Sequence, residues 1–344
     1  MSTRSSNHAV TGRQRTLDFL AGEPTDRLPF HPIIMRWAAQ HAGVNYRDFC
    51  LDPASKCRAM IRCAEDFAID WVTVMSDPYA EASAFGIQVE YPANNLPHET
   101  DHFTSVHELL ALQPYDATAH QRTAGRLEEL RLYRQLTAGR WFVVGWVEGP
   151  IAEYAALRGA NDAAYDFMDE PAAVGEVMDM ITAAAMGFIT LQIAAGADCI
   201  GIGDAFGSQI GPALFRELAF SREKALVDHI HSLGAKAKLH ICGNTSAILP
   251  DMIATGADII DVDHLVQCVA PFVALLAPNQ VFAGRADPVS VMQNGSRHAI
   301  TTAARQMSSE SNGRGIVSAG CEITPATTGE NMRLLREACT SVVP

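Results

Sequence analysis

The stretch Ala237-Lys238-Leu239-His240-Ile241-Cys242 is a short, mostly apolar run that ends in two side chains able to bind a metal. Continuous apolar runs of four to eight residues are typical of strands buried on both faces of a parallel sheet. Seven similar runs occur along the chain: Leu28–Ile34, Trp71–Met75, Trp141–Val147, Asp198–Ile202, Asp258–Val262, Gln280–Ala283 and Gly315–Ala319. We therefore expect eight parallel strands.

Amphipathic helical patterns separate these runs. They cover Ala54–Ala68, Thr123–Leu136, Glu170–Ala195, Pro212–Leu233, Ser296–Ser308 and Thr327–Val342. Alternating strands and helices predict an α/β fold, here a single (β/α)8 TIM barrel over residues 11–344, with a flexible tail over residues 1–10. The stretch Asp77–Tyr133 is long for one connection. It predicts an insertion over the carboxyl-end mouth, either a hairpin or an extra helix, because Gly86–Pro92 alternates like a strand.

Composition excludes several classes of function. The 344 residues, 48% of them hydrophobic, are enough for a large core. A formal net charge of -13 argues against binding to nucleic acid or to an anionic membrane surface. No apolar run reaches the roughly 18 residues that would cross a bilayer, and the start of the chain lacks the apolar core of a signal peptide. We expect a soluble, cytoplasmic protein.

The His240-Ile241-Cys242 triplet predicts a metal site. Residues i and i+2 of a strand project from the same face, about 7 Å apart along the strand. Cys321, in Ser318-Ala319-Gly320-Cys321-Glu322, follows another predicted strand and supplies a third soft ligand. A His/Cys/Cys set suits zinc with one coordination position left open. The alternative interpretation is a buried cluster without metal.

The remaining cysteines do not form a tight framework. The chain has eight in all, and in a reducing compartment most are expected to be free thiols. Cys57, Cys63, Cys199 and Cys339 lie in apparent helices or in a strand, where a thiol acts as a small buried hydrophobe. Cys268, just after an apparent strand, is the alternative third ligand.

Charged or metal-binding residues follow nearly every predicted strand. Active sites of (β/α)8 barrels form at the carboxyl ends of the strands. The residues found there are Arg36, Asp77, Glu148, Asp204, His240, Cys242, Asp263, His264, Arg285, Asp287, Cys321 and Glu322. This regularity indicates an active site rather than scattered surface charge.

Three of these carboxylates each have two interpretations. Asp204 either holds a ligand histidine or a substrate group, or caps the next helix. Glu148 serves either as a proton relay or partner to a ligand, or in a structural salt bridge. Asp77 is either a catalytic carboxylate or a helix cap.

Two arginines, one tyrosine and a further aspartate near the strand ends are also candidates. Arg36 either binds an acidic substrate or forms an ion pair at the mouth, and Arg285 is a second candidate for substrate binding. Tyr154 lies one turn beyond the strand that ends at Glu148. Asp287 is expected to cap the helix that starts at Pro288.

The chemistry of such a site follows from its charge. Zinc with two thiolates and one imidazole is about neutral, and it would lower the pKa of a substrate thiol so that the sulfur can attack an activated methyl group. The same metal could activate water or polarise an ether oxygen. The chain has no G-x-S-x-G elbow, no phosphate-binding loop of the Walker type and no D-x-H-x-x-G corrinoid signature. A corrinoid would therefore arrive on another protein or domain.

Several segments resemble the uroporphyrinogen decarboxylase superfamily over nearly the whole chain. They are Arg15–Pro29, Asp77-Pro78-Tyr79, Glu148-Gly149-Pro150, Gly203-Asp204-Ala205, Leu239–Gly243 with Asn244-Thr245, Ala283–Pro288 and Gly320-Cys321-Glu322-Ile323. Within it, the His-x-Cys and Gly-Cys-Glu patterns resemble zinc methyltransferases that pass methyl groups between methyl-corrinoid proteins and coenzyme M. The resemblance implies His240, Cys242 and Cys321 as zinc ligands. It also implies methylcobalamin on a partner corrinoid protein, a small thiol or methylated substrate, and a homodimer.

Departures from the family pattern leave alternatives open. Trp37-Ala38-Ala39-Gln40 lacks the further arginine of a porphyrinogen site, yet Asp77 and Tyr154 fall where the decarboxylase's Asp and Tyr would, so metal-free tetrapyrrole decarboxylation is an alternative. Arg285 replaces the asparagine expected in coenzyme M enzymes, which also points to members that demethylate methoxylated compounds or methylated amines. Zinc-dependent alkyl transfer without a corrinoid and non-catalytic binding are further alternatives.

Overall fold

Seven parallel strands form one curled sheet in the computed structural model, which describes residues 10–341. The order is β1-β4-β5-β6-β7-β8-β9, so each strand pairs with the next sheet strand along the chain. The bounds are β1 Trp71–Thr73, β4 Phe142–Glu148, β5 Cys199–Gly203, β6 Lys236–Ile241, β7 Ile259–Val262, β8 Val281–Ala286 and β9 Gly315–Ala319. The predicted parallel α/β fold is thus confirmed at this level. Nearly all of the tail expected at residues 1–10 lies outside the described residues.

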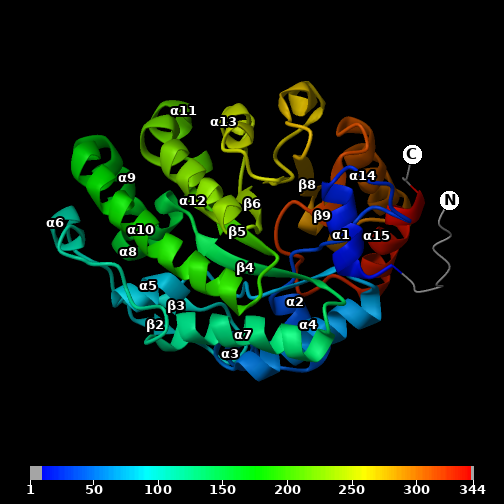
Figure 1. The fold of residues 1–344 in the computed structure, drawn as a ribbon, viewed down its shortest axis with the longest axis horizontal. Coiled ribbons are helices and arrows are strands. Elements are labelled where there is room, and N and C mark those ends of the chain that lie inside the picture. The colour runs from blue at the N-terminus through cyan, green and yellow to red at the C-terminus, as the bar shows by residue number, and fades with distance from the viewer. Residues whose placement is uncertain (1–9, 342–344) are drawn as a thin grey trace.

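Helices pack around the outside of this sheet (Figure 1). The α-helices are α1 Gly12–Leu20, α2 Arg36–Ala42, α3 Tyr46–Leu51, α4 Pro53–Phe67, α5 Ala80–Phe85, α6 Val106–Leu109, α7 Gln121–Thr137, α8 Pro150–Arg158, α9 Ala160–Asp169, α10 Pro171–Ala195, α11 Gly211–Leu214, α12 Ser221–Ser232, α13 Leu249–Ala254, α14 Arg297–Glu310 and α15 Gly329–Ser341. Four further segments are 3-10 helices, η1 Ala205–Ser208 and η3 Ala270–Leu275, or π-helices, η2 Phe215–Phe220 and η4 Pro288–Gln293. The expected helix over Pro212–Leu233 is continuous but contains a wider turn at η2.

The expected first strand, Leu28–Ile34, is not a regular strand. Only Phe30 forms a bridge, to Val317 of β9, and its carbonyl also accepts from the amide of Asp70, just before β1. The segment therefore contacts both edge strands of the curled sheet without a ladder of its own. Pro29 and Pro32 explain the difference, because proline has no N–H to donate to a neighbouring strand.

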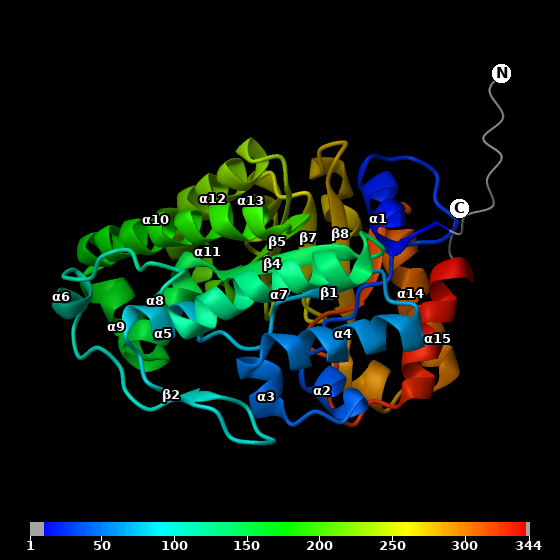
Figure 2. The ribbon, with the colours of Figure 1, turned by 60° about the horizontal axis from the view of Figure 1, so that its bottom comes forward.

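The long connection after β1 contains both a hairpin and helices. Strands β2 (Val89–Glu90) and β3 (His98–Glu99) pair antiparallel, so the strand expected over Gly86–Pro92 is reduced to two residues. The hairpin lies beside α3, where the amide of Arg47 donates to the carbonyl of Ala93 at 3.2 Å (Figure 2). That this insertion covers the mouth stays a prediction.

Helix α10 contradicts the expectation that no apolar stretch is long enough to cross a bilayer. By length and composition it is the one helix among the described residues that could do so. Half of its most apolar window is buried inside the protein, however. The fully buried amide of Gln192 also bonds the backbone N–H and C=O of Trp146 in β4, at 2.9 and 3.0 Å. These are the contacts of a core helix.

Candidate metal centre and active site

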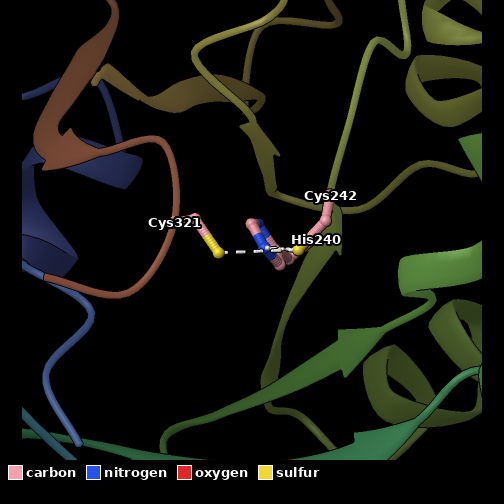
Figure 3. Close-up of side chains that lie close together, drawn as sticks. All are labelled: His240, Cys242 and Cys321. Atoms are coloured by element: carbon pink, nitrogen blue, oxygen red, sulfur yellow. Dashed lines mark hydrogen bonds between the residues drawn. The ribbon is translucent and has the colours of Figure 1, made fainter. Parts of the chain in front are cut away.

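His240, Cys242 and Cys321 lie together at the carboxyl ends of the strands. His240 is in β6, and Cys242 is the first residue after that strand. Cys321 is in the loop after β9 and points across the mouth toward them (Figure 3). The Nε2 atom of His240 lies 3.2 Å from Sγ of Cys242, which lies 3.6 Å from Sγ of Cys321. All three candidate ligand atoms lie within 4.8 Å of one another.

Local backbone features place the two thiols. The amide of Gly243 donates to Asp263 Oδ2 at 3.0 Å, which holds the turn that carries Cys242. Gly320 packs against the backbone of His264, and a Cβ at this position would lie only 2.3 Å from the His264 nitrogen. Any side chain there would push the loop outward, so glycine allows Cys321 to reach Cys242.

The donor set fits a zinc ion. A hydrogen bond from the Cys242 thiol lowers the pKa of Cys321 to about 4, which favours the thiolate form that binds a metal. The same pairing raises the pKa of Cys242, because the two sulfurs compete for one proton. Two sulfurs and one imidazole are ligands that zinc prefers. The alternative ligand, Cys268, is exposed and lies outside this cluster.

Asp261 and Lys238 extend the cluster into the barrel interior, and sequence reasoning missed both. Asp261 of β7 is in register with His240, and its Oδ2 lies 3.3 Å from His240 Nδ1 and 2.6 Å from Lys238 Nζ. All three side chains are buried. The Nδ1 contact is an electrostatic one, outside hydrogen-bond geometry. The contact between Nδ1 and Asp261 leaves Nε2 facing the thiols. A carboxylate that orients a ligand histidine is arranged in this way.

A small cavity of about 190 Å³ opens beside the cluster. Its apolar wall is made by Ile33, Met35, Met75, Pro78, Trp146 and Ala205. The three cluster residues, Gly203 and three carboxyl side chains, Asp77, Glu148 and Glu322, complete the lining. The structure therefore brings these six of the sequence-predicted residues to one cavity.

Glu148 is held in the cavity wall by Trp146. The indole Nε1 of Trp146 donates to Glu148 Oε1 at 2.8 Å. Glycine at position 203 makes room for the indole, since a Cβ there would lie 2.5 Å from the ring. Burial and the negative charge of Glu81 raise the pKa of Glu148 to about 8. A carboxyl with this pKa is able to accept or donate a proton near neutral pH.

Two ion pairs fix the neighbouring carboxylates. Asp77 accepts from Arg122 and from the hydroxyl of Ser76, and Glu81 lies 3.0 Å from Arg126. Arg122 keeps the pKa of Asp77 low despite its burial. Asp77 also accepts from the amide of Tyr79 at 3.1 Å, just before α5. Its contacts thus combine an ion pair and a local turn before α5, and no side-chain cap of α5 is formed.

Behind this wall, Glu153 of α8 is buried, and neither of its oxygens has a hydrogen-bond partner among the described residues. Burial and the charges of Glu81 and Glu148 raise its pKa well above the usual value. The folded state therefore favours the protonated form of Glu153. The contribution of this group to the free energy of unfolding is complete below about pH 4.5, and it is lost as the pH rises toward the pKa of Glu153 in the folded state.

Glu153→Gln should consequently lose less stability than the wild type between about pH 5 and pH 8. Urea unfolding at the two pH values measures the difference in the free energy of unfolding. Glu128→Gln, which removes a half-exposed carboxyl on α7, is the control and should leave the pH dependence unchanged. The same pH slope in Glu153→Gln and wild type would contradict the interpretation.

Asp204 and Tyr154 do not line the cavity, and each forms hydrogen bonds elsewhere. The buried carboxylate of Asp204 accepts from the amide of Ala152 at 2.6 Å, in the first turn of α8, and burial raises its pKa to about 6. It caps α8 rather than the next helix, and the carboxylate that faces His240 is Asp261. The Tyr154 hydroxyl donates to Asp166 at 2.8 Å.

Asp204→Ala should therefore affect stability and not metal content. Loss of the capping interactions at α8 is expected to lower the free energy of unfolding by about 1–2 kcal/mol. Urea denaturation and zinc analysis on the same preparation check both halves of this expectation. A variant that folds normally but loses zinc would contradict it.

The two basic candidates lie outside the cavity lining. Arg36 donates its amide to Glu322 Oε1 at 2.9 Å, while its side chain lines a separate cavity with Tyr46 and Asn94. Arg285 forms an ion pair with Glu310 and donates to the carbonyl of Gln267. Asp287 caps η4 through the amides of Val289 and Ser290, as the sequence predicts.

These features define a class of protein, an α/β fold of barrel type with soft metal-binding side chains in a cavity at the carboxyl ends of its strands. The chain belongs to the family described as uroporphyrinogen decarboxylase (URO-D), whose model matches residues 11–342. The resemblance read from the sequence is thereby confirmed.

Relatives within this family include methyltransferases. The chain is 25% identical to Methylcobamide:CoM methyltransferase MtbA of Methanosarcina mazei, over 95% of this chain and 97% of that protein. It is 23% identical to a uroporphyrinogen decarboxylase of Gloeobacter violaceus, also over 95% and 97%. A solved methyltransferase structure from Methanosarcina mazei superimposes with a TM-score of 0.87 at 21% identity, covering 97% of this chain and 99% of that one. The comparisons support methyl transfer as the class of activity.

Proposed function

We propose that this protein is a zinc-dependent methyltransferase. In this proposal His240, Cys242 and Cys321 hold Zn²⁺, and a methyl group passes between a corrinoid on a partner protein and a small thiol or methylated compound in the cavity. The observation that carries the proposal is the convergence of two sulfurs and one imidazole nitrogen within 4.8 Å at the carboxyl ends of the strands. Similarity to methylcobamide:CoM methyltransferases supports the corrinoid partner.

Bound zinc would supply a Lewis acid that lowers the pKa of a thiol and keeps its sulfur nucleophilic. The protein's own residues prepare the site for that chemistry. Asp261 orients His240 so that Nε2 faces the thiols, and Lys238 keeps Asp261 ionised. The apolar wall of the cavity excludes water from the reacting groups.

Glu148 is the proposed group for proton transfer when a thiol enters the cavity, with its ionised form accepting the proton. It lines the same cavity as the three candidate ligands, and burial with the charge of Glu81 gives it a pKa of about 8. Asp77 is proposed to shape the cavity beside it, because Arg122 already neutralises its charge. The contacts of Asp204, Tyr154, Arg36 and Arg285 support positioning of helices and loops rather than contact with the substrate.

The corrinoid protein is proposed to dock at the mouth, where the cavity opens. We further propose a cytoplasmic location, since free cysteines and thiolate ligands suit a reducing compartment. Pairing of two copies stays a prediction.

Metal-free decarboxylation of a tetrapyrrole is the alternative that the family also allows. Two observations count against it. The cavity of about 190 Å³ is small for a macrocycle, and none of its lining residues is lysine or arginine to bind many carboxylates.

Purified protein incubated with methylcobalamin and a thiol tests the proposal. Zinc-loaded protein should consume methylcobalamin, measured by its change in absorbance, and protein stripped of zinc should not. Equal rates with and without zinc would contradict the proposal, and decarboxylation of a porphyrinogen by zinc-free protein would favour the alternative. Zinc-dependent methylation that needs no corrinoid would favour the simpler alkyl transfer.

A further inference from the structure

The cavity beside the candidate ligands has an unusual charge balance. Its wall is apolar, and its ionisable groups apart from His240 are three carboxyls and two thiols, all neutral or negative: Asp77, Glu148, Glu322, Cys242 and Cys321. No lysine or arginine is among the residues that line it. An anion placed here would lose its hydration without meeting a lysine or arginine to compensate its charge.

The cations nearest in sequence and structure are already used elsewhere. Lys238 is paired with Asp261, Arg122 with Asp77, Arg126 with Glu81 and Arg285 with Glu310. Arg122 and Arg126 are themselves buried, so neither can turn toward the cavity without breaking a buried pair. The Arg36 side chain lines a different cavity.

Two of the three carboxyls have no ion pair within the described part of the chain. Glu148 accepts from the indole of Trp146, and Glu322 accepts from the backbone amide of Arg36. The pKa of Glu148 is raised because its burial and the negative charge of Glu81 outweigh the attraction of Arg126. Burial thus disfavours a negative charge on Glu148, which has no ion-pair partner of its own.

We infer that this cavity selects a small thiol, or the corresponding methyl thioether, that carries no anionic group. Thiols with a sulfonate, carboxylate or phosphate are excluded because no cation offsets their charge. The inference rests on the proposed function and narrows its substrate class. It separates this chain from relatives that are named for CoM, since coenzyme M carries a sulfonate.

Three thiols of equal chain length test the charge selectivity directly. Protein loaded with Co²⁺ in place of zinc is titrated with 2-mercaptoethanol, cysteamine or 2-mercaptoethanesulfonate. Binding is followed by the sulfur-to-cobalt absorption band that a bound thiolate adds. The uncharged and cationic thiols should bind at least about tenfold more tightly than the sulfonate, given the strength of charge interactions in a partly buried site. Equal or tighter binding of the sulfonate would overturn the inference.

A charge inserted into the wall provides the second test. Met75 lines the cavity and is partly buried. Met75→Lys should reduce the preference for the uncharged thiol over the sulfonate by about tenfold, whereas the matched polar variant Met75→Gln should retain it. An unchanged preference in Met75→Lys would show that charge does not set the selectivity.

The two proposals fail in distinguishable ways. If the protein binds no cobalt or zinc, the proposed function is wrong. If it binds cobalt through sulfur and prefers the sulfonate thiol, the metal site stands and the inferred substrate class is wrong.

Discussion

Replacing Cys242 by Ala will remove tightly bound zinc and abolish methyl transfer. Zinc binds to complete four-ligand protein sites with about 10–16 kcal/mol, so each ligand contributes several kcal/mol and loss of one thiolate should weaken binding at least about a hundredfold. The strands should be preserved, because the partly exposed Cys242 lies just beyond β6 and packs little. Zinc content per chain after gel filtration measures the effect.

Two further variants sharpen this result. Cys321→Ala should behave as Cys242→Ala does, since its sulfur lies on the other side of the same cluster. Cys268→Ala is the matched control, because this exposed cysteine was the alternative ligand and lies outside the cluster. Stoichiometric zinc in Cys242→Ala, or loss of zinc in Cys268→Ala, would assign the ligands differently.

Replacing Lys238 by Met will produce the largest loss of stability that we expect in this chain. Lys238 and Asp261 form a fully buried ion pair at 2.6 Å inside the barrel. Removing one partner of a buried pair leaves an uncompensated charge, which typically costs about 3–5 kcal/mol. Urea unfolding of Lys238→Met against wild type measures this cost.

The double variant Lys238→Met with Asp261→Asn separates charge pairing from packing. It should recover much of the lost stability, because neither charge is then buried alone. Zinc affinity should nevertheless stay about 10–100-fold below wild type, since Asp261 no longer orients His240. A double variant as unstable as the sum of the two single variants would contradict the coupling.

Much of the fold could be predicted because its strands are uninterrupted apolar runs. The runs at Trp71, Trp141, Asp198, Ala237 and Gly315 became strands within one or two residues of the expected bounds. The run at Leu28 failed because its two prolines cannot join a ladder. Helix α10 was predicted within one residue of its bounds, but its length and apolar composition, sufficient to cross a bilayer, were not recognised.

The candidate ligands could be found because the signal lies within short segments of sequence. His240 and Cys242 are two residues apart on a strand, and Cys321 follows a second strand. Asp261 could not be assigned in this way, because its position opposite His240 depends on the register between β6 and β7. The signal that was available is charge: Lys238 and Asp261 are charged residues whose immediate neighbours in β6 and β7 are apolar.

The side-chain partners of the strand-end residues were also beyond prediction. Asp204 was expected to face either a histidine or the next helix, yet it caps α8 from a neighbouring strand. Arg285 follows the same strand-end pattern as the cavity residues, but Glu310 holds it outside the cavity. The partner of each such side chain depends on which polar or charged groups lie near it in the folded protein.

X-ray absorption at the zinc edge of the purified wild-type protein tests the central claim most directly. Our account predicts one zinc per chain with two sulfur ligands at about 2.3 Å and at least one nitrogen ligand at about 2.0 Å. Protein that contains no zinc after purification and reconstitution, or zinc bound without sulfur, would contradict it.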